Sequence, residues 1–183
     1  MTTIAYCHET KLLAADTRIT VNDYPGYCQK ILFPKKGVIV ATAGDAGEGE
    51  WLRLQLAKIT NIKELYFLED KPKMKDLRAF IWWKGTPYGL LDSLLPFPIE
   101  SKFFTCGTGG DLVLAYLALG MPIHEAMLRA VKLDINSAAP IHVVDCSKSE
   151  KLLLTYTEIQ DQPKSEVVSI PNTIEPETNS KSI

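Results

Sequence analysis

The sequence predicts a single layered α+β domain, because the expected strands and helices are grouped into separate runs. In chain order we expect strands, one helix or two, further strands, two helices and final strands. Such grouping is typical of α+β packing and not of alternating βαβ units. Residues 38–41, Val-Ile-Val-Ala, are typical of a strand that is buried on both faces. A chain of 183 residues has the length of one domain and can bury a substantial core.

Two hairpins are expected at the start of the chain. Residues 2–7 and 11–18 are rich in apolar residues and strand formers, with a short polar turn between them. Residues 28–34 and 37–44 form a second pair of strands that turns at a lysine–glycine sequence. Residues 22–27, Asn-Asp-Tyr-Pro-Gly-Tyr, have the composition of a turn cluster and are expected to connect the two hairpins.

The helices are expected in the middle and towards the end of the chain. Residues 44–59 suit a helix with one apolar side, formed by Trp51, Leu54, Leu56 and Ile59. Residues 61–80 are ambiguous and have room for one short helix. The other expected elements are a hairpin over residues 79–92, a strand over 103–110, helices over 111–120 and 122–137, and strands over 140–146 and 151–159.

A folded domain is expected over residues 1–160. The last stretch, residues 161–183, has three prolines among Ser, Asn, Glu and Lys. Such a composition buries too little apolar surface to offset the entropy lost on ordering, so a disordered tail is expected there.

Composition excludes several classes of function. The net charge is −2 and the basic residues are dispersed among acidic ones, which is unlike a nucleic-acid-binding protein. No apolar run approaches the roughly 20 residues that span a membrane, and the N-terminus does not resemble a secretory signal. The cysteines and histidines lack metal-ligand spacing, so no metal or cofactor is expected. Scattered cysteines indicate reduced thiols and a cytoplasmic location; they are Cys7, Cys28, Cys106 and Cys146.

Short segments with a fixed order carry a resemblance to a known family. The chain begins Met-Thr-Thr-Ile-Ala-Tyr, and Leu-Leu-Ala-Ala-Asp-Thr-Arg follows, with Asp16 and Arg18 in an A-x-D-x-R pattern. Cys-Gln-Lys-Ile-Leu contains Lys30. Ala-Thr-Ala-Gly, Cys-Gly-Thr-Gly-Gly and Asp-Ile-Asn-Ser come later. Each segment alone is unspecific, but as an ordered set over residues 2–157 they resemble the proteasome β-subunit family of N-terminal-nucleophile (Ntn) hydrolases, and most closely its bacterial two-component member.

The resemblance implies both a fold and a nucleophile. The fold would be a four-layer αββα sandwich, with two antiparallel sheets between helix layers. Thr2 would be the nucleophile once Met1 is removed. Its own α-amino group has a reference pKa of about 7.7–8.0, close to the pH at which a general base works best. An N-terminal threonine therefore needs no separate histidine to activate its hydroxyl. The alternative is that Met-Thr-Thr is an ordinary start to a first strand.

The family assigns roles to further residues at matching positions. Lys30 would lie beside Thr2 and disfavour protonation of the amine, and Asp16 would keep Lys30 charged and oriented. An Asp next to Leu and Ala residues is also atypical of a solvated surface. Gly44 would supply a backbone N–H to the oxyanion hole. Asp45, where the family often has a second glycine, would oppose the oxyanion if its carboxylate pointed inward.

The remaining expected site residues tune the amine or bind substrate. By the same resemblance, Thr108 matches a family serine near the nucleophile and keeps its hydroxyl. Asp134 and Ser137 would tune the N-terminal amine, although a helix C-terminal turn alone would explain these two. Backbone groups of Thr20 and Ala46 would bind a substrate strand by β-augmentation. A small to medium, mainly apolar pocket would accept the first substrate side chain, lined by Ile19, Cys28 and Thr42.

Three functions remain open at this stage. The leading hypothesis is a threonine endopeptidase that cleaves peptides or unfolded proteins inside a homo-oligomeric ring, with an ATP-dependent unfoldase as a candidate partner. The second is a non-proteolytic Ntn amidohydrolase that acts on a small amide. The third is a catalytically inactive structural or assembly subunit with the same fold. Retention of Thr2, Asp16 and Lys30 favours an enzyme, whereas Asp45 and the short middle segment favour the inactive subunit.

Overall fold

A computed structural model of the chain describes residues 2–21, 24–68, 76–91, 95–148, 152–159 and 164–167. Within these residues the fold is α+β, as predicted, and every strand pair is antiparallel. The larger sheet has the order β10-β1-β2-β11-β12-β13, and its strands are β1 Thr3–Cys7, β2 Leu12–Asp16, β10 Phe103–Gly107, β11 Ile141–Asp145, β12 Leu152–Tyr156 and β13 Lys164–Val167. The second sheet has the order β5-β6-β7-β8-β9, and its strands are β5 Ile31–Lys35, β6 Val38–Ala43, β7 Arg78–Trp83, β8 Thr86–Leu91 and β9 Phe97–Pro98.

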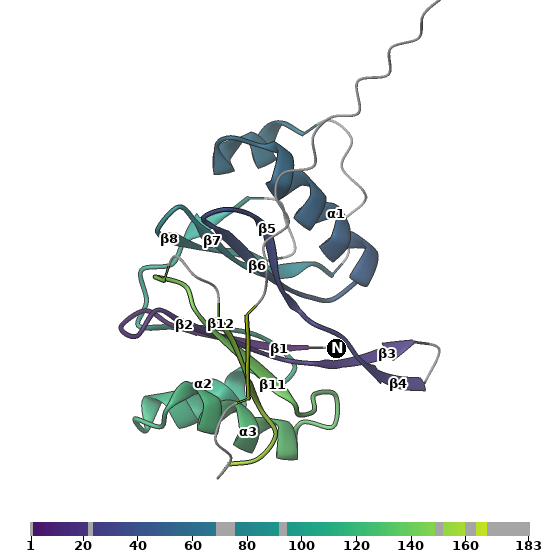
Figure 1. Ribbon diagram of the computed structural model, residues 1–183, viewed down its shortest axis with the longest axis vertical. Helices are drawn as coiled ribbons and strands as arrows, with labels where there is room; N and C mark the ends of the chain where they lie inside the picture. Colours follow the sequence, from purple (N-terminus) through teal and green to yellow (C-terminus); the bar gives the residue numbers. More distant parts are fainter. Residues whose placement is uncertain are drawn as a thin grey trace, which may run out of the picture.

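Helices cover the outer faces of the two sheets. Figure 1 shows α1, Ala46–Lys58, above the sheet that contains β6 and β7. Helices α2, Gly110–Ala118, and α3, Ile123–Leu133, lie on the far side of the sheet that contains β1 and β2. The inner faces of the two sheets are turned towards each other. In the described residues, no helix is both long enough and apolar enough to pass through a lipid bilayer.

Strand β1 explains how the layers are held together. Its side chains alternate between two cores because successive residues of a strand point to opposite faces. Ile4 and Tyr6 belong to the cluster between the sheets, where the Tyr6 ring lies 4.6 Å from that of Phe80. Ala5 and Cys7 belong to the cluster that packs under α2 and α3. A strand buried on both faces is thereby fixed in register, which positions the residue that precedes it.

Most predicted elements are present. The hairpins β1–β2, β5–β6 and β7–β8 lie where the sequence predicts them. Residues 38–41 are buried on both faces, as expected. The buried side of α1 is formed by Leu52 and Leu56, four residues apart, whereas Leu54 is 37% exposed, so the prediction was wrong for Leu54. In the ambiguous region, Ile62–Phe67 form a 3₁₀ helix with a capping box, while residues 69–75 lie outside the described part.

Two predictions need correction. The turn cluster at 22–27 contains strand β4, Tyr24–Tyr27, which pairs with β3, Arg18–Val21, as a separate two-stranded sheet. Proline is accepted there because, among the described residues, β4 pairs with β3 alone and no second strand needs the missing N–H. Of the tail predicted over residues 161–183, the structure describes Lys164–Val167, which pair with β12 and therefore extend the sheet. The rest of the predicted tail lies outside the described residues.

Candidate active site

Thr2 lies directly before β1 and is buried, with 6% of its surface exposed. Its carbonyl oxygen accepts a hydrogen bond from the Thr108 N–H at 3.1 Å. The neighbouring Gly107 has φ of +90°, and a Cβ on it would lie 1.7 Å from the Thr2 carbonyl oxygen. Only glycine fits this position without a shift in the backbone, so the Gly-Thr-Gly-Gly turn after β10 is built closely around the start of the chain.

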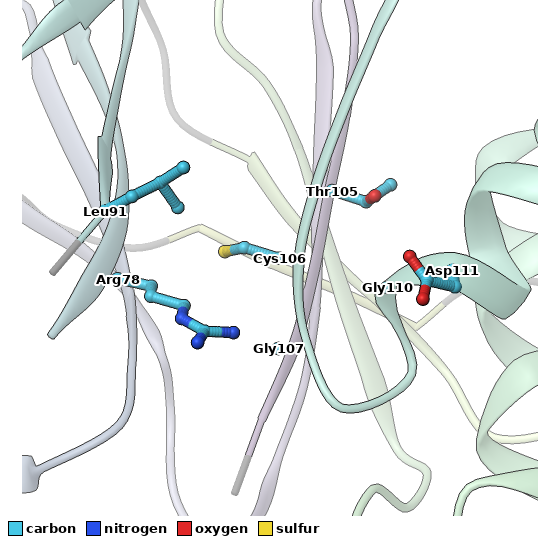
Figure 2. A pocket seen from close by; sticks show the side chains of 7 residues that line it. All are labelled: Arg78, Leu91, Thr105, Cys106, Gly107, Gly110 and Asp111. Carbon is cyan, nitrogen blue, oxygen red and sulfur yellow. The ribbon is translucent and has the colours of Figure 1, made fainter. Parts of the chain in front are cut away.

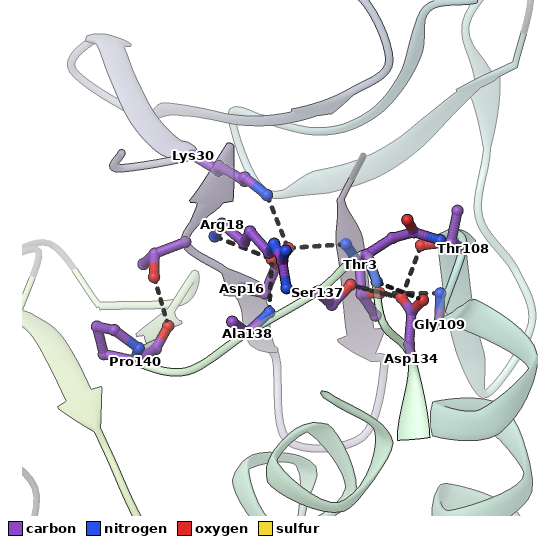
Figure 3. Close-up of polar contacts among 12 residues, drawn as sticks. Thr3, Asp16, Arg18, Lys30, Thr108, Gly109, Asp134, Ser137, Ala138 and Pro140 are labelled. Carbon is purple, nitrogen blue, oxygen red and sulfur yellow. Dashed lines mark hydrogen bonds and ion pairs between the residues drawn. The ribbon is translucent and has the colours of Figure 1, made fainter. Parts of the chain in front are cut away.

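A buried ion pair lies beside this strand end. Asp16, the last residue of β2, is fully buried, and Lys30, just before β5, is 7% exposed. The Lys30 Nζ lies 2.8 Å from Asp16 Oδ1 (Figure 3). Burial of two charges is costly unless the remaining lone pairs are also satisfied. Here they are, because Asp16 also accepts backbone N–H groups from Thr3 at 2.8 Å, Arg18 at 3.0 Å and Ala138 at 3.4 Å.

The charge on Lys30 depends on its partner. Burial lowers the pKa of Lys30, since it removes water from the ammonium group. The Asp16 carboxylate opposes this effect through its charge and its hydrogen bond, but the net pKa stays below the usual lysine value. Asp134 raises the Lys30 pKa more weakly. A lysine in this position supplies a positive charge near the Thr2 backbone that is held in place by Asp16.

A second carboxylate, that of Asp134, lies at the end of α3. Its Oδ2 accepts hydrogen bonds from the hydroxyls of Ser137 and Thr108, each at 2.6 Å, and its Oδ1 accepts the Asn136 N–H at 3.0 Å. Burial would raise the pKa of Asp134, but hydrogen bonds from Ser137, Thr108, Asn136 and Thr3 together bring it below its usual value. The group is therefore an ionised acceptor at neutral pH.

Thr3 joins the two carboxylates and was not predicted from the sequence. Its N–H donates to Asp16, and its hydroxyl contacts Ser137 Oγ at 2.7 Å and Asp134 Oδ2 at 3.4 Å (Figure 3). The sequence shows only a polar residue in an apolar strand. That this position is fully buried is visible only in the structure. In the described residues, Thr3, Asp16, Lys30, Thr108, Asp134 and Ser137 thus form one connected polar network around the start of β1.

Gly44 follows β6 and has φ of +100°. A Cβ on Gly44 would lie 1.6 Å from the Asp76 carbonyl oxygen, so the backbone approach there requires glycine. The next residue, Asp45, is the N-cap of α1, and its carboxylate accepts the Glu48 N–H at 3.0 Å. This bond accounts for an aspartate at 45, because a carboxylate there satisfies a free N–H group at the helix start.

The five expected substrate-binding residues come from two regions. Ile19 and Thr20 lie on β3, and Cys28 follows β4. Cys28 is exposed overall, but partial burial of its thiol raises the thiol pKa; Lys30 lowers this pKa and Asp16 raises it. Thr42 lies on β6 with its hydroxyl against Gly49, where a Cβ would come within 2.7 Å of it, and Ala46 is the exposed first residue of α1. In the described residues no hydrogen bond joins these five residues to one another, and their shared role stays a prediction.

A cavity of about 350 Å³ lies beside β10 (Figure 2). It is lined by Arg78, Leu91, Thr105, Cys106, Gly107, Gly110 and Asp111. Gly107 belongs to this lining and also packs against the Thr2 carbonyl, whereas Thr2 itself does not line the cavity. Burial raises the pKa of the Cys106 thiol to about 12, partly opposed by Arg78, which leaves a neutral thiol and not a nucleophile. None of the predicted pocket residues lines this cavity.

No group of three or more His, Cys, Asp and Glu residues that could hold a metal ion occurs in the described part of the chain. The polar network instead has the composition of a proton-handling site: two carboxylates, one lysine and several hydroxyls. Such a site can orient and tune a nearby nucleophile without a metal ligand set.

Comparisons with known proteins support the same fold. No protein-family model and no curated protein matches the sequence. Among solved structures, BPH from Thiobacillus denitrificans in complex with epoxomicin is similar, with a TM-score of 0.60 and 17% identity over 80% of this chain and 100% of that chain. HslV from Trypanosoma brucei is similar with a TM-score of 0.58 and 15% identity, over 78% of this chain and 97% of that one. The resemblance predicted from the sequence is therefore confirmed at the level of the fold, which is that of the proteasome β-subunit-like Ntn hydrolases.

Proposed function

We propose that this protein is a threonine-type peptidase whose nucleophile is Thr2, exposed as the N-terminal residue after removal of Met1. The observation that carries this proposal is the buried pair of Lys30 and Asp16, 2.8 Å apart, whose carboxylate also binds the N–H of the residue after Thr2. A buried ion pair contributes little net stability compared with apolar residues of the same size. Its retention beside the start of the chain therefore supports a chemical role.

The chemistry needs only groups that Thr2 itself carries. The Thr2 oxygen attacks the carbonyl carbon of a peptide bond, and its proton passes to the α-amine, directly or through one water molecule. The amine then gives this proton to the leaving nitrogen as the C–N bond breaks, which leaves an ester on Thr2. A water molecule activated by the same amine hydrolyses the ester and frees the enzyme.

The surrounding residues supply electrostatic support in this proposal. The Lys30 ammonium disfavours protonation of the nearby amine, and Asp16 holds the ammonium in place. Gly44 donates its N–H to the oxyanion, with the backbone fixed by the contact with Asp76. The hydrogen bond between Asp45 and Glu48 N–H commits the Asp45 carboxylate to α1, which removes the main sequence argument for an inactive subunit. Thr108, Asp134 and Ser137 tune the amine.

The proposal also includes the layer arrangement of the fold and the assembly of the protein. The arrangement of α1, two sheets, and α2 with α3 corresponds to the four-layer αββα sandwich of Ntn hydrolases. A homo-oligomeric ring is part of this proposal and would cover exposed apolar side chains such as Leu133 and Ile135, which are 62% and 83% exposed. The substrates would be peptides or unfolded proteins, bound along Thr20 and Ala46, with an ATP-dependent unfoldase as candidate partner.

The direct test is a Thr2→Ala variant assayed with a panel of peptides and small acyl amides. We expect the variant to fold and to lose hydrolysis, because no other residue carries both the hydroxyl and the amine. Thr86→Ala, at an exposed threonine at the start of β8, is the matched control and should keep full activity. Undiminished peptide cleavage by Thr2→Ala would show that another residue is the nucleophile. Cleavage of acyl amides but not peptides by the wild type would favour the amidohydrolase.

A further inference from the structure

The Thr3 hydroxyl lies at the centre of the polar network but has no role in the chemistry proposed above. Thr3 is fully buried, and three described groups surround its hydroxyl oxygen. These are Ser137 Oγ at 2.7 Å, Asp134 Oδ2 at 3.4 Å and the Gly109 N–H at 3.0 Å (Figure 3). Thr3, Ser137 and Gly109 are buried, so polar groups of theirs that lost a hydrogen-bond partner would not readily find water in its place, whereas Asp134 is only half-buried.

The directions of these hydrogen bonds follow from counting protons. An ionised Asp134 can only accept, so the hydroxyls of Ser137 and Thr108, each 2.6 Å from its Oδ2, both donate to it. Ser137 has then used its one proton. In the 2.7 Å contact with Ser137, Thr3 must be the donor, so its one proton serves this contact first and the longer 3.4 Å contact with Asp134 Oδ2 second. The Gly109 N–H can only donate, so Thr3 accepts from it.

The result is a hydrogen-bond chain with one direction. It runs from the Gly109 N–H, at the N-cap of α2, through Thr3 and Ser137 to the Asp134 carboxylate. The start of a helix carries a partial positive charge and the carboxylate a full negative one, so both ends polarise the chain in the same sense. Thr3 is one of two described links between the turn before α2 and the end of α3; the other is the direct hydrogen bond from the Thr108 hydroxyl to Asp134.

This hydrogen-bond network also holds Thr108 in place. This residue lies next to Gly109 in the turn after β10, and its N–H holds the Thr2 carbonyl at 3.1 Å. Because its hydroxyl proton is committed to Asp134, the Thr108 oxygen keeps its lone pairs for another donor. In a mature protein that begins at Thr2, the α-amine of Thr2 is such a donor, and it belongs to the residue that the Thr108 N–H already contacts.

From this geometry we infer that Thr3 is a positioning residue of the hydrolytic site. Its hydroxyl holds the turn at Thr108 and Gly109 against the Asp134–Ser137 pair, so that the Thr108 oxygen can accept a hydrogen bond from the Thr2 amine. This inference rests on the proposed function, because it assigns Thr3 a part in orienting that amine. The role differs from simple core packing, since it requires the hydroxyl and not the shape of the side chain.

The test compares Thr3→Val, which keeps the shape and removes the hydroxyl, with Thr3→Ser, which keeps the hydroxyl and removes one methyl group. We expect Thr3→Val to lower kcat about 10- to 100-fold with KM nearly unchanged, a range typical of a small misplacement of catalytic groups. Thr3→Ser should recover most of the wild-type kcat. Thr155→Val, on β12 in the same sheet, is the control for removal of a strand hydroxyl and should behave as wild type.

Each outcome bears on a distinct claim. If Thr3→Val keeps full kcat while Thr2→Ala is inactive, the positioning role is wrong and the proposed nucleophile stands. If Thr3→Ser is as impaired as Thr3→Val, the methyl group matters and the role is packing, which also overturns the inference. Activity in Thr2→Ala would instead overturn the proposed function. Should Thr3→Val not fold, Thr3→Ala takes its place, and failure of both to fold would make the hydroxyl a requirement of the fold alone and overturn the inference.

Discussion

At the scale of single residues, the site depends on burying Lys30 and Asp16 without leaving either charge unpaired. Asp16 meets this condition with both of its carboxylate oxygens. Oδ1 binds Lys30 and the Thr3 N–H, and Oδ2 binds backbone N–H groups that include that of Ala138. Each donor comes from a different segment of the chain, so the carboxylate ties β1, β2 and the loop before β11 together. The same contacts that stabilise the charge thereby fix the start of β1, where Thr2 lies.

Replacement of Lys30 by methionine tests this dependence. Lys30→Met leaves Asp16 buried with backbone donors alone, and loss of one partner of a buried pair costs about 3–5 kcal/mol. We expect the lower end, about 3 kcal/mol in urea unfolding, because the three backbone N–H groups remain. Peptide hydrolysis should fall at least about 100-fold, the loss seen when one preorganised electrostatic group is removed.

Lys102→Met is the matched control for this variant. Lys102 pairs with Glu9 at 3.2 Å, but both side chains are exposed, at 61% and 70%. A surface pair of this kind contributes about 0–1 kcal/mol, so the control should be almost as stable as the wild type and fully active. If Lys30→Met were no less stable than Lys102→Met, the buried pair would not have the structural role assigned to it.

The sequence motifs single out five side chains that the structure brings together through Thr3, whereas the backbone donors were not predictable and the catalytic roles stay predictions. Asp16, Lys30, Thr108, Asp134 and Ser137 lie in motifs that resemble a family, and the structure joins all five in one network. The N–H groups that stabilise Asp16 are backbone groups, which nearly every residue type has, so no residue pattern predicts them. Thr3 was missed for a related reason, because a second threonine after Thr2 is typical of an ordinary strand.

At the scale of secondary-structure elements, the site is assembled at strand ends where glycine permits close backbone contacts. Gly107 at the end of β10 and Gly44 after β6 both have positive φ, and both lie against a carbonyl oxygen, of Thr2 and Asp76 respectively. Strand β6, which leads to Gly44, is buried on both faces over residues 38–41, and this fixes its end in place. The turns then need glycine because a Cβ would occupy the space of the neighbouring backbone.

Two alanine variants separate the strain of a positive φ from the clash of an added Cβ with neighbouring backbone. Gly37 has φ of +77°, and a Cβ added there would have no atom within 4 Å, so Gly37→Ala should cost only the left-handed strain of about 1–2 kcal/mol. Gly44→Ala carries the same strain and would also place a Cβ 1.6 Å from the Asp76 carbonyl oxygen. We expect Gly44→Ala to be clearly less stable than Gly37→Ala in urea unfolding and to lose hydrolysis, whereas Gly37→Ala stays active.

Equal stability of the two alanine variants would contradict the close contact between Gly44 and Asp76. A fully active Gly44→Ala would count against the oxyanion role, because the substitution must move the N–H that is proposed to stabilise the oxyanion. The two readouts are therefore independent: stability reports on the fold of the turn, and hydrolysis reports on its chemistry.

The elements that sequence reasoning found are those with strong local patterns. The hairpins and residues 38–41 have apolar periodicity, which local sequence encodes directly. Strand β4 was missed because Pro25 and Gly26 are typical of turns, while its pairing with β3 depends on a neighbouring strand. Strand β13, Lys164–Val167, was predicted as tail because its residues are mostly polar. It forms a strand by pairing with the edge strand β12, and a local pattern does not show such pairing. The two-residue β9 is too short to give a pattern.

At the scale of the whole molecule, two sheets with helices outside them bring distant segments to one place (Figure 1). Thr2 and Asp134 are separated by most of the chain, yet the Thr3 hydroxyl lies 3.4 Å from the Asp134 carboxylate. Thr108 of this network directly follows Gly107, which lines the cavity. A peptide-cleaving role follows only if Thr2 is the first residue of the mature chain, because an amide at its nitrogen would remove the proposed base.

The central claim is therefore tested most directly by labelling the purified, assembled protein with epoxomicin and mapping the modified residue by mass spectrometry. The account predicts a chain lighter by one methionine and one inhibitor molecule bound to Thr2, with no label on Thr2→Ala. A mature chain that retains Met1, or a label on any residue other than Thr2, would contradict it.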